Sequence, residues 1–456
     1  MAFSALDSDI LSPLVTTARM RAVFSDTARV AAMLAAEAAL ARAQASLGLA
    51  PAELAETIAA IDPASLDLAA LGMATGVSGV PVIPFVKAVQ QRLPRELEPA
   101  FHKGATTQDI ADTALVLQMR DAFAALREDL LPTMDGLARM ASVHRATPCA
   151  GRTYGQHAAP VTFGFKAAVW LTGLAEVADR LPEVERRSLV VSLGGPVGTL
   201  AGLGDKGPAV LEDMAKALGL VAPPIAWHVR RTAMADTAAW LAMLCGVLGK
   251  FASDVASLAS TEVGEVAEAP MPGRGGSSAM PHKRNPVSAT VILAAAGAAP
   301  PLASTVLASM VAAHERPAGA WHAEWHALPQ LFGLAAGALA EGRRLAEGLV
   351  VDPARMAANL GLTRGLLFAD AAAARLAALC GREAAHAIVE RAAGIVRDTG
   401  TPLLDALLAL DGLPPGVDRA LLAPAFDVAP SVAAAATFVD RALAHAATVR
   451  GRTAQT

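Results

Sequence analysis

The sequence predicts an all-α protein with a bundle of very long helices at its centre. Apolar residues recur at helical spacing in nearly every long segment, and no run of β-branched residues with turn spacing indicates a sheet. Hydrophobic residues make up 54% of the 456 residues, and charged residues only 18%. This composition is too apolar for a monomer of that size to stay well solvated, so we expect wide interfaces between protein chains.

Five long helices are expected along the chain. The first follows Ser25 and Asp26, which can cap a helix N-terminus, and Gly48 can end it. The others are expected at 112–140 with an interruption near Pro132, at 163–187, at 231–268, and from 287 onward with a break at Pro300 and Pro301. Helices of this length need neighbours that bury their apolar faces, which again predicts an oligomer.

Breaks near residues 111 and 355 divide the chain into three predicted domains. A small helical N-terminal domain spans 1–111, and a long-helix core with a glycine-rich loop spans 112–355. A helical C-terminal domain spans 356–456. No internal repeat and no low-complexity linker interrupts this organisation.

Charge and cysteine patterns exclude several classes of partner. The net charge is -4 without any block of like charge, so nothing predicts binding to nucleic acid or to an anionic membrane. Residues 287–313 carry no charge and are long enough to cross a bilayer, but they are rich in alanine and contain a proline pair, so we expect a buried helix. The first ten residues lack the basic segment of a signal peptide, and Cys149, Cys245 and Cys380 lack metal-ligand spacing. We therefore expect a cytoplasmic protein without a bound metal.

Four polar islands interrupt the apolar helices. They are "HKGATTQDIADT" at 102–113, "GRTYGQHAAPVTFG" at 151–164, "SLGGPVGTLAG" at 192–202 and "GRGGSSAMPHKRNP" at 273–286. The last combines glycines, serines and cations directly before an expected helix start, which favours an anion site. A solvated linker there, a plain helix cap in the first island and a structural histidine in the second remain alternatives. No zinc spacing, P-loop or dinucleotide fingerprint is present, so we expect no cofactor.

Three of these islands together resemble the fumarase/aspartase superfamily. "GSSAMPHKRNP" is similar to its signature loop, and the islands at 102–113 and 151–164 are similar to two further family segments, with Thr107 where serine is more usual. "MRAVFSD", "TEVGEVAEA" and "HERPAGAWHAEWHALPQLF" resemble the branch of carboxymuconate cycloisomerases within it. The resemblance covers nearly the whole chain. It implies a homotetramer with a 20-helix core, in which each active site takes residues from three subunits.

The resemblance also implies the residues of the site and their roles. Ser277 is the expected base, with its oxyanion held by loop amides and a nearby cation. Lys283, Asn285 and the start of the following helix are expected to bind a substrate carboxylate and to stabilise an aci-carboxylate dianion. The expected catalytic residues are Ser277, Lys283 and His157, and the expected substrate-binding residues are His102, Thr106, Thr107, Thr153, Tyr154, Gln156, Asn285 and Arg316.

Tyr154 stands where superfamily lyases that expel an amine or hydroxide carry a histidine. That histidine helps to protonate a poor leaving group, whereas a carboxylate, whose conjugate acid has a pKa of about 4, leaves as the anion. Lactonisation of a small tricarboxylate by its own carboxylate therefore fits Tyr154, and His157 is close enough in sequence to take over an acid role. The alternatives are a lyase acting on a nitrosuccinate-type substrate or on adenylosuccinate, and a catalytically silent structural relative. An intact Ser277, Lys283 and Asn285 argue against the last.

Overall fold

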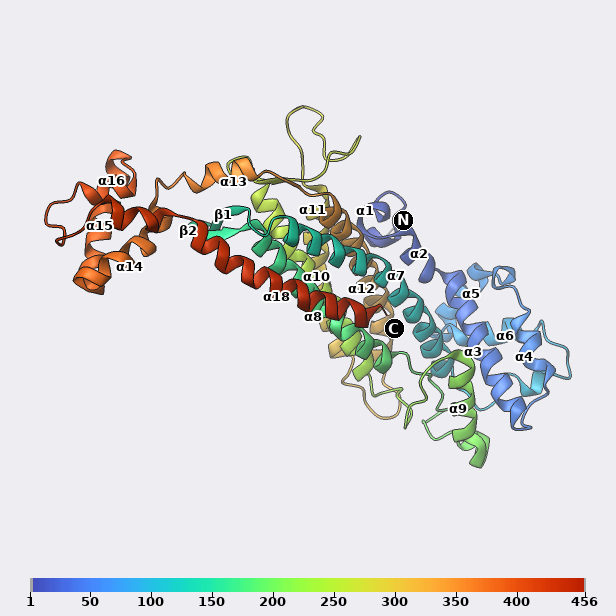
Figure 1. The fold of residues 1–456 in the computed structure, drawn as a ribbon. Helices are drawn as coiled ribbons and strands as arrows, with labels where there is room; N and C mark the ends of the chain where they lie inside the picture. The colour runs from blue at the N-terminus through green and yellow to red at the C-terminus, as the bar shows by residue number, and fades with distance from the viewer. Residues whose placement is uncertain (1–2, 455–456) are drawn as a thin grey trace.

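The computed structural model describes residues 3–454 and is mostly helical (Figure 1). Five long helices form its centre: α7 (Thr107–Val143), α8 (Phe163–Ser188), α10 (Thr232–Leu258), α11 (Val287–Ala308) and α12 (Ala320–Gly348). In this bundle α11 packs between α10 and α12, and α7 packs on both α8 and α12. The predicted helical class is confirmed, while the 20-helix core of a tetramer stays a prediction.

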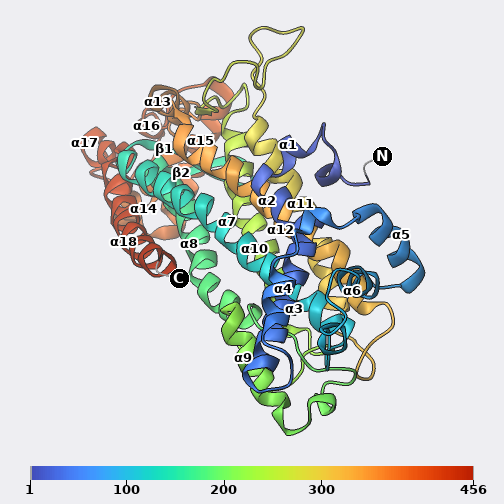
Figure 2. The same ribbon diagram turned by 90° about the vertical axis from the view of Figure 1, so that its right-hand side faces the viewer.

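Shorter helices surround the bundle at both ends of the chain. On the N-terminal side they are α1 (Ser12–Val15), α2 (Ala18–Val23), α3 (Asp26–Ser46), α4 (Glu53–Ala59), α5 (Leu68–Ser78), α6 (Val82–Gln90) and, later in the chain, α9 (Gly207–Leu218). On the C-terminal side they are α13 (Pro353–Leu360), α14 (Ala369–Cys380), α15 (Arg382–Thr399), α16 (Leu403–Leu408), α17 (Arg419–Leu422) and the longer α18 (Ala429–Thr453). Helices α14 to α16 enclose a small hydrophobic core of their own, and α18 returns along α8 and α7 (Figures 1 and 2).

Several predicted helix ends are close to the observed ones, and others are wrong. Ser25 caps α3 by accepting a hydrogen bond from the Ala28 N–H at 3.2 Å, as its side chain and position predicted. Pro132 and the Pro300–Pro301 pair lie inside continuous helices, because packing along the whole helix compensates for the backbone hydrogen bonds that proline removes. Helix α10 ends at Leu258 rather than near 268, and an irregular segment follows it.

Two small sheets correct the expectation of a chain without strands. β1 (Pro148–Thr153) pairs antiparallel with β2 (Gln156–Thr162), and β3 (Val266–Ala267) pairs with β4 (Val350–Val351). The first pair is a hairpin whose two turn residues, Tyr154 and Gly155, have φ values of 50° and 78°. Positive φ at both central positions is the geometry that joins twisted strands through a two-residue turn. The second polar island therefore forms most of a hairpin, and its last two residues begin α8 at Phe163.

Helix α8 runs antiparallel to α10, and the bundle has two distinct ends. Trp170 near the start of α8 donates to Asp254 near the end of α10 at 2.7 Å, while Arg180 further along α8 contacts Asp236 near the start of α10. The glycine-rich loop before α11 projects from one end, and the start of α7 lies at the other, beside α3 and α9 (Figure 1). The polar islands are consequently divided between the two ends.

Large apolar surfaces remain uncovered in the single chain. Within the described residues, the segments Thr232–Leu258, Val287–Ala308 and Arg419–Thr453 are long and apolar enough to cross a membrane, judged by length and composition alone. Only 33% of the most apolar stretch of α11 is buried in this chain. Exposed apolar area of this extent marks a surface that some partner covers. We expected this helix to pack inside an oligomer, and that remains a prediction.

Candidate active site

The signature loop (273–286) is exposed and connects β3 to α11. Its two arms meet at one narrow point, where the Asn285 N–H donates to the Gly275 carbonyl at 2.8 Å. Gly275 has a φ of +70°, and a Cβ there would lie 2.6 Å from the Asn285 carbonyl oxygen, so only glycine fits. Beyond this point the loop presents Ser277, whose Oγ accepts a backbone N–H at 3.1 Å, and the exposed side chain of Lys283. The expected base and the expected cation therefore share one open loop.

A buried polar cluster holds the base of the signature loop. Arg274 on the first arm forms an ion pair with Glu341 of α12 and donates to Ser288 Oγ at 3.0 Å. Ser288, in the first turn of α11, donates in turn to Glu341 at 2.6 Å. The cluster joins both ends of the loop to the bundle, so the freely exposed span lies between Arg274 and Ser288.

The start of α11 does not offer free donors to an external anion. The N–H groups of Ser288 and Ala289 donate to the two carboxylate oxygens of Glu268, at 3.1 and 3.0 Å. An internal carboxylate thus already satisfies the helix end that was expected to bind a substrate carboxylate. On this loop, the side chains of Lys283 and Asn285 are exposed and remain open to a ligand, as are those of Ser278, His282 and Arg284.

The β1–β2 hairpin carries four of the expected residues at its tip. Thr153 and Gln156 form the last cross-strand pair, and Tyr154 lies fully exposed in the turn between them. Nothing in the described part of this chain packs over the phenol ring. His157 follows in β2, opposite Arg152.

His157 is a neutral imidazole by its surroundings. Partial burial lowers its pKa, the cationic Arg152 and Lys166 lower it further, and only Glu265 opposes them. Its Nδ1 is buried and has no hydrogen-bond partner in the described part of the chain. Arg152 is itself held by Glu265 in a bidentate pair at 2.5 and 3.0 Å, which fixes the hairpin to the bundle. A neutral histidine can accept a proton or a hydrogen bond, but it is poorly suited to act as an acid near neutral pH.

The start of α7 gathers another group of the expected residues at the opposite end of the bundle. Thr106 is the N-cap and forms a capping box with Asp109. Arg316 donates to Thr106 Oγ1 at 3.2 Å and to Gln108 Oε1 at 3.1 Å, and Thr107 begins the helix beside them. Arg316 Nη2 is buried and has no hydrogen-bond partner among residues 3–454. A buried unpaired guanidinium nitrogen is costly, and a carboxylate from a ligand would satisfy it.

A buried network behind Thr106 was not predicted. Asp109 accepts hydrogen bonds from the N–H groups of Gly194 and Gly195, at 2.8 and 2.9 Å, and from His228 Nε2 at 2.6 Å. It thereby joins the first and third polar islands to a histidine far away in sequence. The i, i+3 spacing of acids in "TQDIADT" was visible, but nothing in the sequence indicated the partners.

Asp112 forms a second buried network one turn further along α7. Arg231 pairs with both Asp112 and Glu324, and Trp321 Nε1 donates to Asp112 at 2.9 Å. Burial raises the pKa of Glu324, the charge of Asp112 adds to the effect, and Arg231 opposes it. This network locks α7 to the start of α12, and so supports the loop that carries Arg316.

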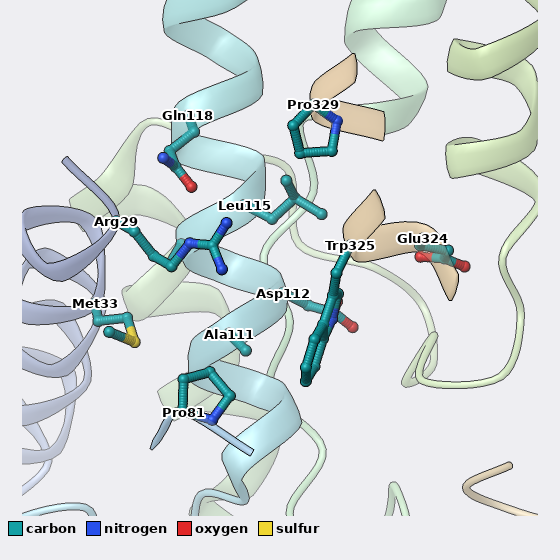
Figure 3. Close-up of a pocket in the computed structure, with 11 residues that line it drawn as sticks. Arg29, Met33, Pro81, Ala111, Asp112, Leu115, Gln118, Glu324, Trp325 and Pro329 are labelled. Atoms are coloured by element: carbon teal, nitrogen blue, oxygen red, sulfur yellow. The ribbon is translucent and has the colours of Figure 1, made fainter. Parts of the chain in front are cut away.

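A pocket between α3, α7 and α12 borders this network (Figure 3). Arg29 points into it from α3, while Asp112, Glu324 and Trp325 lie on the opposite side. None of the expected site residues lines this pocket. It is therefore separate from the candidate site.

In a single chain, the signature loop and the Thr106–Arg316 group lie at opposite ends of the bundle. The signature loop enters α11 at its first residue, and Arg316 follows its last residue after a short connection. The 22 residues of α11 span about 33 Å, because an α-helix rises 1.5 Å per residue. Ser277 and Arg316 of one chain are thus held at opposite ends of a helix far longer than a small substrate.

Comparisons with known proteins show which family the chain resembles. A lyase family model matches residues 14–300. The 3-carboxy-cis,cis-muconate cycloisomerase of Pseudomonas aeruginosa is 49% identical over 378 residues, covering 82% of each chain. The nitrosuccinate lyase of Streptomyces davaonensis is 44% identical over 453 residues, covering 96% of this chain and 95% of its own. The crystal structure of the 3-carboxy-cis,cis-muconate lactonizing enzyme of Pseudomonas putida superimposes with a TM-score of 0.91 at 40% identity, over 97% of this chain and 100% of its own.

The long-helix bundle and the serine-bearing loop before α11 are features of a helical enzyme of the fumarase/aspartase type. The match over most of the chain makes the assignment specific: the chain belongs to the lyase family of this superfamily.

Proposed function

We propose that the chain is a cycloisomerase that converts 3-carboxy-cis,cis-muconate into 4-carboxymuconolactone. Relatives at 49% and 40% identity carry that activity in their names, which supports the assignment. The reaction would belong to cytoplasmic catabolism of aromatic compounds, in the protocatechuate branch of the β-ketoadipate pathway.

The single observation that carries the proposal is the environment of the hairpin tip. Tyr154 stands where an amine-expelling enzyme needs an acid, and the nearby His157 is kept neutral. In lactonisation a substrate carboxylate oxygen adds to the carbon–carbon double bond, and the electrons move into the neighbouring carboxylate to give an aci-carboxylate dianion. Ser277 then supplies the proton to carbon, and Lys283 offsets the developing charge. No leaving group needs a proton in either direction.

A second candidate function is elimination of nitrite from nitrosuccinate. The observation in its favour is the nearly full-length match to the nitrosuccinate lyase, over 96% of this chain. Nitrite also leaves as a stable anion, so Tyr154 is compatible with both reactions. An adenylosuccinate lyase activity fits less well, because it expels an amine.

The test is a direct assay of purified protein on both substrates. Lactonisation is followed by loss of the absorbance of the conjugated muconate, and elimination by colorimetric detection of nitrite. Rapid lactonisation without nitrite release supports the cycloisomerase. Nitrite release with a kcat/KM at least a hundredfold above that of lactonisation would reverse the assignment.

We propose further that the active protein is a homotetramer whose active sites each combine residues from three subunits. The separation of Ser277 from Arg316 by about 33 Å of helix supports this assembly, and so does the exposed apolar face of α11. One subunit would supply the signature loop, a second the hairpin tip, and a third the Thr106–Arg316 end. The uncovered apolar helices would then be buried against other copies of the chain, with no role for a membrane or a nucleic acid.

Native mass spectrometry at micromolar concentration tests the assembly, and subunit mixing tests the shared site. A Ser277→Ala chain and an Arg316→Ala chain are each expected to be inactive. Mixed and allowed to exchange, they are expected to regain part of the wild-type activity, because some sites then receive both intact residues. No recovery after verified exchange would place each site within one chain.

A further inference from the structure

His102 is held by a carboxylate buried in a different helix. Its Nδ1 lies 2.6 Å from Oε1 of Glu37, which is only 1% exposed in the middle of α3. His102 has a φ of 56°, a backbone conformation that a residue with a side chain rarely adopts. The surrounding structure must therefore impose this conformation, and in it the imidazole ring of His102 is hydrogen-bonded to Glu37.

The second carboxylate oxygen of Glu37 and the second ring nitrogen of His102 have no hydrogen-bond partner among residues 3–454. Glu37 Oε2 is buried and has no partner, so the carboxylate directs its charge at His102 alone within residues 3–454. The Nε2 of His102 makes no hydrogen bond within those residues, and the side chain is 18% exposed. Four residues further along the chain lies Thr106, which Arg316 contacts. Glu37 thus holds Nδ1 of His102. The Nε2 atom makes no hydrogen bond among the described residues, and it belongs to the segment that continues to Thr106 and its contact with Arg316.

We infer that Glu37 is a positioning residue that keeps His102 protonated, so that His102 acts as a cation for a substrate carboxylate beside Arg316. The inference rests on the proposed function and deepens it, because 3-carboxy-cis,cis-muconate carries three carboxylates. Arg316 and Lys283 provide cations for two of them. A charged His102 provides the third, which a dicarboxylate substrate such as nitrosuccinate does not require.

The charged groups around the ring favour this state. Burial by itself lowers the pKa of His102, but the hydrogen bond to Glu37 and the charges of Glu37 and Asp109 outweigh it, so the net pKa is raised. Without Glu37, burial would oppose only the more distant Asp109, and the imidazole would lose its proton at lower pH. The imidazolium is therefore present below the raised pKa and is lost as the pH rises through it.

The experiment measures binding of propane-1,2,3-tricarboxylate against pH by calorimetry, for the tetrameric wild type and for Glu37→Gln. In the wild type, affinity is expected to hold up to the raised pKa of His102 and then fall. In Glu37→Gln the fall is expected at lower pH, with about tenfold weaker binding near neutral pH and recovery of affinity in acid. The control is Glu185→Gln, which removes a half-buried carboxylate paired with Arg127 in α7, away from His102.

Each outcome decides the inference separately from the proposed function. A downward shift of the binding limb in Glu37→Gln but not in Glu185→Gln supports the inference, even if the wild type fails to lactonise the muconate. A loss of affinity in Glu37→Gln that is uniform across pH, or unchanged binding, would overturn it, since a residue that only stabilises the fold does not move a titration. If the protein lactonises the muconate but the binding limb does not shift, the proposed function holds and the inference about Glu37 fails.

Discussion

The two ends of the helix bundle are built in opposite ways. At the start of α7, Arg316 is held by Thr106 and Gln108, and buried carboxylates support this group from behind. At the start of α11, the signature loop is exposed, and its two arms meet near its base at Gly275 and Asn285. A rigid end suits recognition of a fixed carboxylate, whereas an open loop suits a group that must approach and leave the substrate. If each end has its proposed role, binding and proton transfer belong to different parts of one chain.

The largest expected effect belongs to the open end. Ser277→Ala removes the hydroxyl that is asked to transfer the proton, and should lower kcat at least a thousandfold while binding of the tricarboxylate probe persists. The matched control is Ser278→Ala, which changes the neighbouring hydroxyl. Steady-state kinetics and calorimetry give both quantities. Activity within about tenfold of wild type, equal to ~1.4 kcal/mol of transition-state stabilisation, would assign proton transfer to another residue.

The second largest expected effect is at the start of α7, where Thr106 and Gln108 hold Arg316. Arg316→Lys keeps the charge but loses the planar fork, and should raise KM roughly 10- to 100-fold with a smaller change in kcat, since hydrogen bonds to charged groups contribute about 1.5–3 kcal/mol. The control is Arg29→Lys in the separate pocket of Figure 3, which should leave KM unchanged. A fall in kcat alone would place Arg316 in the chemical step.

A smaller effect tests the anchor of the loop. Ser288→Ala deletes one hydroxyl between Arg274 and Glu341, and should speed proteolytic cleavage within the loop and lower kcat about three- to tenfold. Ser309→Ala is its control, because that buried hydroxyl at the far end of α11 bonds only its own helix, at Thr305. Equal cleavage rates in the two variants would show that the cluster does not hold the loop.

The smallest effect concerns the hairpin tip. Tyr154→Phe keeps the ring and should cost less than roughly tenfold in kcat, far below the 10²–10⁴-fold loss typical of a general acid. His157→Asn is measured beside it across pH. A thousandfold loss in Tyr154→Phe, with loss of a basic limb, would make the tyrosine an acid. The same loss in His157→Asn would move that role to the histidine, against the lowered pKa given by its burial and cationic neighbours.

Much of the fold follows from local sequence, because helical periodicity and capping residues act over a few positions. Ser25 as the cap of α3 and the start of α8 at Phe163 are examples. The hairpin was missed because its strands are short and its only strong signal was Gly155 after Tyr154. Pro132 misled because proline was judged by its local cost, while packing over the full length of α7 maintains that helix.

The candidate site was predictable as segments and not as a network. Motifs drew attention to the segments around Ser277 and Thr106, but the helix expected from 112 begins at Thr107. The partners that orient them come from distant segments: His228 reaches Asp109, and Glu37 reaches His102. Such pairings are set by how helices pack, and one sequence carries no local trace of them.

The length of α11 has a consequence for how the protein behaves on dilution. Under the proposed assembly, a chain whose signature loop and Arg316 are separated by about 33 Å of helix does not turn over a small substrate alone. Specific activity should then report the fraction of assembled protein, falling below the dissociation concentration although every chain remains folded. A subunit defective at one end would also impair sites that its normal neighbours help to build. One defective copy in a tetramer could then inactivate more than one of the four sites.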